Sequence, residues 1–401
     1  MAIPATTHAG GEVSVGRAIL AGSCASLVGI GLARFAYTPL VPVLVTEQWF
    51  TPAQAAYLGG ANLAGYLVGA LAARRMNAIA PVSVVMRAMM LLATASFFAC
   101  AHPVAFSWFF AWRLIAGVSG GALMVLAAHA VLPHVPSFRH GLAGGAIFTG
   151  VGLGIAASGL LVPPLLRWGL GATWNGLGIL SLALTLLAWT GWPRQTRGSE
   201  TATDGGKLHL RSPGALNALY VEYGLNAAGL VPHMLFLVDF IARGLGQGLV
   251  AGARYWVVFG IGAVGGPLLA GLAADRIGFR PALRLALLVQ ALAVALVVFA
   301  DGPAALLVSS AVVGAFVPGV VPLALGRVHE LVSGEQSRRR AWSLCTAAFA
   351  LGQAGAAYAF SYVFAQTGGG YRPLFATGAA ALLLALAIDL IWQRANGVVA
   401  P

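Results

Sequence analysis

The sequence carries little charge. Only 8% of its 401 residues are Asp, Glu, Lys or Arg, whereas 59% are hydrophobic and the mean hydropathy is +0.86. Soluble chains of ordinary composition carry about 25% charged residues, so this composition excludes a soluble globular protein. The sequence also lacks the alternating apolar and polar segments that build transmembrane β-barrels. We therefore expect an all-α polytopic membrane protein.

Cysteines and clusters of reactive side chains are also scarce. Cys24, Cys100 and Cys345 lie in or at the ends of apolar runs without the spacing of metal ligands, which favours small core residues. The chain has no nucleophile–base pair and no set of metal ligands, so we expect no enzyme, no bound metal and no cofactor. The first fifteen residues lack a basic segment and precede a run longer than a signal-peptide core, so no cleaved signal is expected.

Long apolar runs recur along almost the whole chain, and each can cross a bilayer as a helix. The predicted spans lie near residues 17–44, 53–72, 80–101, 105–132, 141–166, 171–191, 214–240, 252–274, 281–300, 303–328, 339–365 and 372–393. The longest polar stretch separates six spans from six and has the composition of a flexible linker. The predicted organisation is a tail (1–15), a six-helix bundle (16–191), a cytoplasmic linker (192–213), a second six-helix bundle (214–394) and a tail (395–401).

The net charge of +12 is unevenly distributed. With the N-terminus inside, most basic residues fall in cytoplasmic loops and tails, which is the positive-inside pattern and places both termini in the cytoplasm. The basic surplus therefore follows from topology and does not indicate a nucleic-acid partner, and it suits binding to anionic lipid headgroups. We expect a monomer in the bacterial inner membrane.

The two halves of the chain repeat one another. Residues 69–74 (GALAAR) follow the second span and residues 271–276 (GLAADR) follow the eighth, and Phe148 with Gly154 matches Phe349 with Gly355 at nearly the same offset. Parallel six-span repeats are typical of two-bundle secondary transporters, whose substrate site lies between the bundles at the membrane midplane.

Several motifs resemble the major facilitator superfamily. Residues 271–280 (GLAADRIGFR) are similar to its loop signature, although Ala73 replaces the acid in the first-half copy. Residues 113–120 resemble the fourth-span motif of proton-coupled members, and residues 150–163 resemble the glycine-rich fifth-span motif of antiporters.

Residues 29–42 and 232–246 resemble the YbfB/YjiJ-type branch of that superfamily. The superfamily resemblance covers the whole chain. It implies the major facilitator fold, in which two pseudo-symmetric six-helix bundles rock in alternating access, and it implies transport without naming the cargo.

Arg34 and Arg113 lie inside predicted spans. A charge near the bilayer centre costs at least ~2.5–3.5 kcal/mol on insertion scales, so such a residue normally faces a polar interior. A guanidinium suits a carboxylate, which makes both arginines candidates for substrate binding. Pairing of Arg34 with an acid such as Asp239 is the main alternative, and the resemblance gives Arg113 a role in helix contacts and proton transfer. The first span has no acid, which argues against a pump for cationic drugs.

Three polar residues share one face of the seventh span. Glu222, Asn226 and His233 lie at positions i, i+4 and i+11 and are predicted to line a wet cavity, in which Asn226 and His233 would contact the substrate. Glu222 and His233 are candidates for proton coupling, because a carboxyl group and an imidazole can both titrate near neutral pH. The alternative is a structural ion pair for Glu222 and a hydrogen-bonded core position for His233.

The remaining candidates are gating residues and cavity-lining side chains. Asp239 and Arg243 form an i, i+4 pair that is expected to act as a closing latch or a surface pair, and Asp239 is also a candidate for proton coupling. The resemblance implies a charge latch for Asp275, Arg276 and Arg280. Polar or aromatic side chains that could line the cavity are Tyr37, Asn62, Tyr66, Trp256, Gln353, Tyr358 and Tyr362. Of these, Tyr37, Asn62, Trp256 and Tyr358 are the predicted substrate contacts.

The leading hypothesis is a secondary active transporter for a small polar organic solute that bears a carboxylate, driven by the proton gradient. A second hypothesis is an efflux pump for neutral sugars or amphipathic drugs. A third is a membrane sensor that no longer transports.

Overall fold

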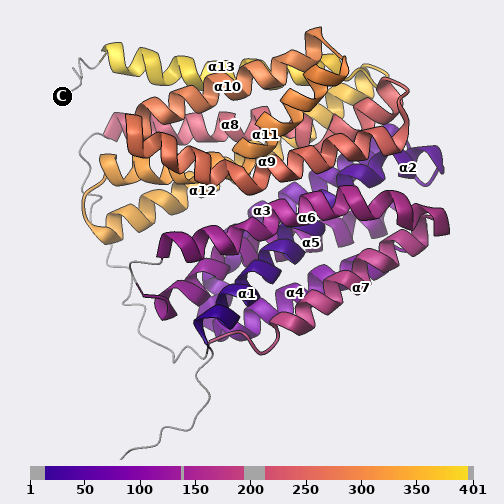
Figure 1. Cartoon of the computed structure of the whole chain (residues 1–401), viewed down its shortest axis with the longest axis horizontal. Coiled ribbons are helices and arrows are strands. Elements are labelled where there is room, and N and C mark those ends of the chain that lie inside the picture. The colour runs from indigo at the N-terminus through magenta and orange to yellow at the C-terminus, as the bar shows by residue number, and fades with distance from the viewer. Residues whose placement is uncertain (1–13, 137–139, 194–212, 396–401) are drawn as a thin grey trace, which may run out of the picture.

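The computed structural model describes residues 14–136, 140–193 and 213–395, which are helical almost throughout (Figure 1). The predicted tails (1–15 and 395–401) and linker (192–213) lie almost entirely outside these residues.

The first half contains six membrane crossings. The first crossing combines α1 (Val15–Ser26), the π-helix η1 (Leu27–Leu32), the 3-10 helix η2 (Phe35–Leu40) and α2 (Val41–Thr46). The others are α3 (Pro52–Ile79), α4 (Val82–Ala99), α5 (Phe106–Val131) with η3 (Leu132–His134), α6 (His140–Leu165) with η5 (Leu166–Trp168), and α7 (Leu170–Ala188).

The second half repeats this arrangement. It contains α8 (Pro213–Asp239) with the π-helix η6 (Phe240–Gly244), α9 (Gly248–Ile277), α10 (Phe279–Phe299), α11 (Pro303–Leu331), α12 (Glu335–Gln366) and α13 (Arg372–Ala395). Among the described residues, 11 helical segments are long and apolar enough to cross a membrane. The remaining long helix, α12, is less apolar because it carries three arginines at residues 338–340, near its start, and Gln353 and Ser361 further on.

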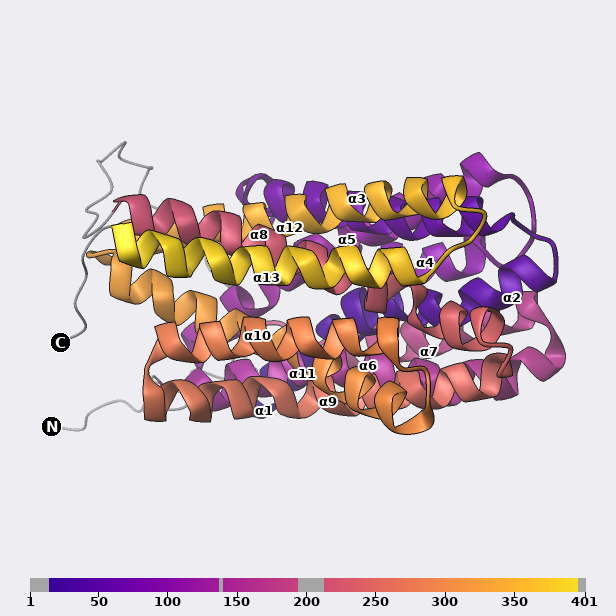
Figure 2. The same ribbon diagram turned by 90° about the horizontal axis from the view of Figure 1, so that it is seen from above.

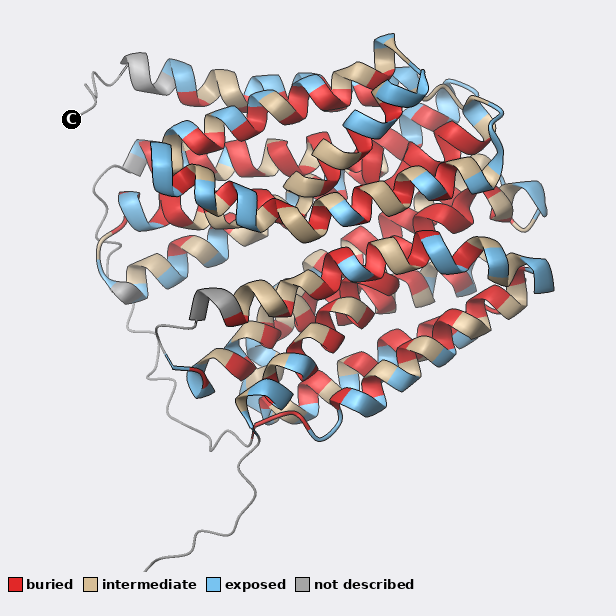
Figure 3. Cartoon of the chain, viewed as in Figure 1, coloured by how far each residue is buried: buried red, intermediate tan, exposed pale blue. Residues whose placement is uncertain are grey.

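The outside of the molecule is apolar along the helices. Large hydrophobic side chains are exposed there, including Ile179 (62%), Leu268 (67%) and Phe299 (85%). Buried residues face the bundle interiors (Figure 3). Soluble proteins rarely expose such extended apolar surface, whereas lipid tails cover it without cost. The protein is therefore an integral membrane protein with the all-α polytopic fold that the composition predicts.

Both halves contain the same kind of close helix–helix contact, in which a glycine of one helix lies against the backbone of another. In the first half, a Cβ added to Gly69 of α3 would lie 2.0 Å from the carbonyl oxygen of Val118 on α5. In the second half, a Cβ added to Gly266 of α9 would lie 1.8 Å from the carbonyl oxygen of Ala315 on α11. Small residues at matching positions thus let equivalent helix pairs approach to backbone contact.

The two bundles meet through α3 with α12 and α6 with α9. Because the chain crosses an even number of times, α1 begins and α13 ends on the same side, which we call the termini side (left in Figure 2). Gly145, Gly152 and Gly159 repeat every seven residues along α6. Gly152 and Gly159 contact α9, whereas no atom lies within 4 Å of a Cβ added to Gly145, the member nearest the termini side. The bundles are therefore closed on the opposite side and part toward the termini side.

Candidate functional site

The first crossing is broken at its centre, and Arg34 lies at the break. The π-helix η1 ends just before Ala33, and the 3-10 helix η2 starts just after Arg34. Pro39 within η2 has no N–H to donate, so a regular α-helix cannot run through this segment. Arg113 of α5 donates a 2.7 Å hydrogen bond to the carbonyl oxygen of Ala33 and thereby satisfies an acceptor at the break.

The guanidinium of Arg34 points to the interface between the bundles. Its central carbon lies 5.1 Å from the ring centroids of both Phe35 and Tyr66, which hold it by cation–π contacts. Its Nη2 lies 4.0 Å from the sulfur of Met234 on α8, in the other bundle. Arg34 is half-buried, and its buried Nε has no hydrogen-bond partner. No acid within the described ranges pairs with it, so a positive charge lies free at the interface.

Asp239 is paired elsewhere. Arg243 donates to both of its carboxylate oxygens, at 2.5 and 2.6 Å, and Tyr371 donates to one of them at 2.7 Å. Burial, together with the Asp239 carboxylate, raises the pKa of Tyr371, so its phenol stays a donor. The alternative expectation that Arg34 pairs with Asp239 is therefore wrong. The predicted i, i+4 pair is present, and all three groups belong to one bundle.

Two further polar contacts cross the interface near Arg34. Thr38 donates a 2.5 Å hydrogen bond to the carbonyl oxygen of Met234, and Trp256 of α9 donates a 3.1 Å hydrogen bond to Ser158 of α6. Gln353 of α12 approaches from the same side as Met234, with its amide nitrogen 3.4 Å from the methionine sulfur. Arg34, Met234 and Gln353 form what we call the central site.

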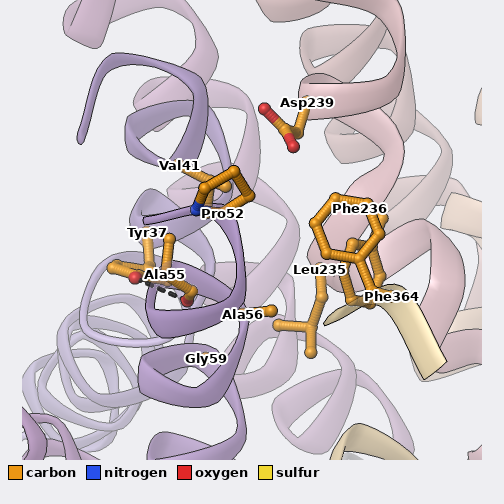
Figure 4. A pocket seen from close by; sticks show the side chains of 10 residues that line it. All are labelled: Tyr37, Val41, Pro52, Ala55, Ala56, Gly59, Leu235, Phe236, Asp239 and Phe364. Carbon is orange, nitrogen blue, oxygen red and sulfur yellow. Dashed lines mark hydrogen bonds between the residues drawn. The ribbon is translucent and has the colours of Figure 1, made fainter. Parts of the chain in front are cut away.

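A narrow pocket lies between the bundles on the side opposite the termini (Figure 4). Tyr37, Val41 and Pro52 lie on one wall, and Phe236, Phe364 and Asp239 lie on the other. The remaining lining residues are Ala55, Ala56, Gly59 and Leu235. The lining is almost wholly apolar, and it belongs to the closed side of the interface.

Three predicted substrate contacts make their polar contacts within the first bundle. Tyr37 donates to the carbonyl oxygen of Ala55 (2.8 Å), and Asn62 donates to the carbonyl oxygen of Arg113 (3.2 Å). Arg113 is 3% exposed and lies over the ring of Tyr37, 4.2 Å from its centroid. These residues support the break in the first crossing and do not reach the central site. Tyr358 does lie at the interface, where its ring faces that of Tyr57.

Asn226 and His233 also point away from the interface. Asn226 donates to Gln290 on α10 (3.0 Å), and the Nε2 of His233 bonds Ser309 on α11 (2.7 Å). The His233 ring also packs edge-on against Phe375 of α13. Asn226 and His233 do share a face of α8, but this face packs against the other helices of the second bundle. These two residues therefore do not form the predicted wall of a wet cavity.

Glu222 lies in the same bundle, nearer the termini side. It is 4% exposed, and the charged groups that act on it are Asp389, Arg327, Arg280 and Arg284. Within the described part of the chain it has no hydrogen bond or ion pair of its own. The structure thus places a buried, unpaired carboxyl group among three arginines and a second carboxylate.

The predicted gating residues divide into two groups. Arg280 and Arg284 of α10 both pair with Asp389 of α13, the first at 3.2 Å. Asp275 and Arg276 are exposed at the end of α9, and the described residues provide no ion pair for either. Among the described residues, the charge latch expected at Asp275 is therefore not formed.

Met234 is the central-site residue that the sequence did not suggest. It is an apolar residue in an apolar span, and no pattern distinguishes it from its neighbours. Gln353 carried a signal, since an amide inside a span is costly unless it has partners, but the sequence alone could not rank it above the other polar residues.

Comparison with known proteins identifies relatives. The family model described as "Uncharacterised MFS-type transporter YbfB" matches residues 26–390. A "Chloramphenicol resistance protein" of Streptomyces lividans is 28% identical over 382 residues, which cover 90% of this chain and 92% of that protein.

Solved structures share the fold. A D-xylose–proton symporter superposes with a TM-score of 0.74 at 15% identity, covering 93% of this chain and 97% of the symporter. The nucleoside transporter NupG superposes with a TM-score of 0.72 at 14% identity, covering 93% of this chain and 99% of that one. At these identities the likeness establishes the fold alone.

Proposed function

The chain belongs to the YbfB-type family of major facilitator transporters, and from this premise we propose that it moves a small organic anion, one that bears a carboxylate, in exchange for or together with protons. It is a transporter of a small-molecule solute and not an enzyme. The anionic class of the solute and the coupling to protons are the proposed elements.

The free charge of Arg34 carries the anion proposal. An unpaired guanidinium in a low-dielectric interior is costly, and a carboxylate is the partner that its donor fork fits. The two flanking rings of Phe35 and Tyr66 fix its position. Arg34 contacts residues of both bundles, so binding of a ligand to Arg34 would depend on how the two bundles are placed relative to each other.

The test is thermal unfolding of the purified protein with a panel of carboxylates, sugars, nucleosides and amphipathic drugs. A ligand that binds the folded state raises the melting temperature by mass action. We expect carboxylates to stabilise the protein and Arg34→Lys, which keeps the charge but loses the fork, to weaken their binding about tenfold or more. Arg254→Lys, at an exposed arginine of α9, is the matched control. Stabilisation by neutral compounds alone would overturn the proposal.

Glu222 supports the proposal of proton coupling. A buried carboxyl group without an ion-pair partner is favoured in its protonated form, and a rearrangement of Arg280, Arg284 or Arg327 around it would favour release of the proton. We expect Glu222→Gln to retain ligand binding in detergent while losing acid-driven uptake into liposomes. Uptake that stays proton-driven in this variant would exclude Glu222 as the coupling site.

A second candidate function is efflux of a neutral amphipathic drug. The observation that favours it is the relative that carries resistance to chloramphenicol. In this case chloramphenicol would stabilise the protein, and Arg34→Lys would leave its affinity within about twofold. The same thermal-unfolding panel therefore separates the two candidates.

The membrane setting completes the proposal. We assign the termini side to the cytoplasm of a bacterial inner membrane, because it carries most of the basic residues, and we propose that the monomer binds anionic lipid headgroups there. The conformation described here would then open inward.

A further inference from the structure

Two strong hydrogen-bond donors at the central site share one weak acceptor. The sulfur of Met234 lies 3.4 Å from the amide nitrogen of Gln353 and 4.0 Å from the Nη2 of Arg34. A thioether sulfur accepts hydrogen bonds poorly, so neither donor is well satisfied. Arg34 comes from the first bundle and Gln353 from the second, and among the described residues the sulfur is the hydrogen-bond acceptor that both nitrogens share.

Each of these polar groups also has an unused atom. The Nε of Arg34 and the Oε1 of Gln353 are buried and have no hydrogen-bond partner. The side chain of Gln353 is also closed to solvent, because the residue is only 2% exposed. Buried polar atoms are rarely left unpaired in native structures, and each exception calls for an explanation. Arg34 can only donate, whereas the free oxygen of Gln353 can only accept.

We propose that the sulfur of Met234 holds the place of the substrate's anionic group, and that the substrate is a carboxylate with a hydroxyl group close to it. The carboxylate displaces the sulfur and accepts hydrogen bonds from Arg34 and from the amide nitrogen of Gln353. The hydroxyl group donates to the Oε1 of Gln353. This inference rests on the proposed function and narrows its substrate class to hydroxy acids.

The donor on the substrate is a hydroxyl group rather than an ammonium group. An ammonium group would need a second anionic partner, and Asp239, the acid that lines the neighbouring pocket, is already bound by Arg243 and Tyr371. A simple inorganic anion such as chloride would neutralise Arg34 but would offer no donor to Gln353.

The experiment compares matched acids that differ by one hydroxyl group. Dissociation constants are measured by thermal unfolding of the purified full chain with lactate against propionate, and with mandelate against phenylacetate. We expect each hydroxy acid to bind about fivefold more tightly than its partner, as one net hydrogen bond provides. Gln353→Met should abolish this ratio. Gln290→Met, which removes a buried glutamine of α10 that bonds Asn226, should lower stability but keep the ratio.

Met234→Leu tests the displaced sulfur. The change preserves the volume of the side chain and removes the competing acceptor, so both acids of each pair should bind more tightly at an unchanged ratio. Weaker binding would show that the sulfur contacts the ligand and would overturn its role as a placeholder.

The outcomes separate this inference from the proposed function. Binding that depends on Arg34 but shows no hydroxyl preference, or keeps the preference in Gln353→Met, overturns the inference and leaves the anion transporter standing. If no acid stabilises the protein, the proposed function fails and this inference fails with it.

Discussion

Arg113 donates its 2.7 Å hydrogen bond to the carbonyl oxygen of Ala33, the residue directly before Arg34. One buried arginine thereby holds the helix break that presents the other arginine to the interface. The two charges have different roles, although sequence reasoning placed both among the substrate contacts. Arg113 is a positioning residue, and Arg34 is the candidate ligand contact.

The first prediction separates these roles. Arg113→Lys should weaken binding of a carboxylate and of its uncharged amide by a similar factor, about threefold to tenfold, because the break loses a net hydrogen bond. The preference for the carboxylate over the amide should remain. Arg34→Lys should instead reduce that preference. Thermal-unfolding titrations with each pair measure both effects, and loss of the preference in Arg113→Lys would assign it a direct contact.

The second prediction concerns His233. Ser309 donates its hydroxyl hydrogen to the carbonyl oxygen of Ala293 (2.6 Å), so the Nε2 of His233 must be the donor in the His233–Ser309 bond. The imidazole is fully buried, and its Nε2–H donor is bonded within the second bundle. His233→Gln, which keeps an amide donor, should leave the pH dependence of liposome uptake unchanged within about twofold. A loss of proton-driven uptake equal to that expected for Glu222→Gln would make His233 a coupling residue.

The helices were predictable because apolar length is encoded locally. Each predicted span falls on a helix, but Gly69 and Gly271, which were expected to follow the second and eighth spans, lie within α3 and α9. The direction in which a polar side chain points was not predictable in the same way. The shared face of Glu222, Asn226 and His233 follows from helical periodicity, but whether that face meets the interface or the bundle interior depends on how α8 is rotated against α10, α11 and α13.

The central site shows the same limit. Arg34 stood out because a charge in an apolar run is costly. Met234 carried no such mark, since its role comes from its distance to Arg34 and Gln353 across the interface. The partner of Asp239 was also ambiguous in the sequence, where both Arg34 and Arg243 were available.

The third prediction addresses the Asp239–Arg243 pair. The carboxylate is 1% exposed and the guanidinium 23% exposed. Asp239→Asn should lower stability by about 2 kcal/mol, less than the 3–5 kcal/mol of a fully buried pair, because water still reaches Arg243. The double variant Asp239→Asn with Arg243→Gln should recover part of this loss, since it removes the uncompensated charge. Thermal unfolding of Asp239→Asn, of Arg243→Gln and of the double variant completes the double-mutant cycle, and additive losses would mean that the pair is not coupled.

The fourth prediction uses two adjacent glycines of α9. A Cβ on Gly266 would lie 1.8 Å from the carbonyl oxygen of Ala315, whereas no atom lies within 4 Å of a Cβ on Gly265. Gly266→Ala should therefore force α9 and α11 apart and lower stability by about 1–3 kcal/mol. Gly265→Ala should be neutral or slightly stabilising, because alanine has the higher helix propensity and meets no neighbour. The two variants differ by one position in the same helix, so the helix and its length are the same, although Gly266 is buried and Gly265 is half-buried. Equal melting temperatures would show that α9 and α11 are not in backbone contact in the membrane. The conclusion that glycines bring equivalent helix pairs of the two halves into backbone contact would then be wrong.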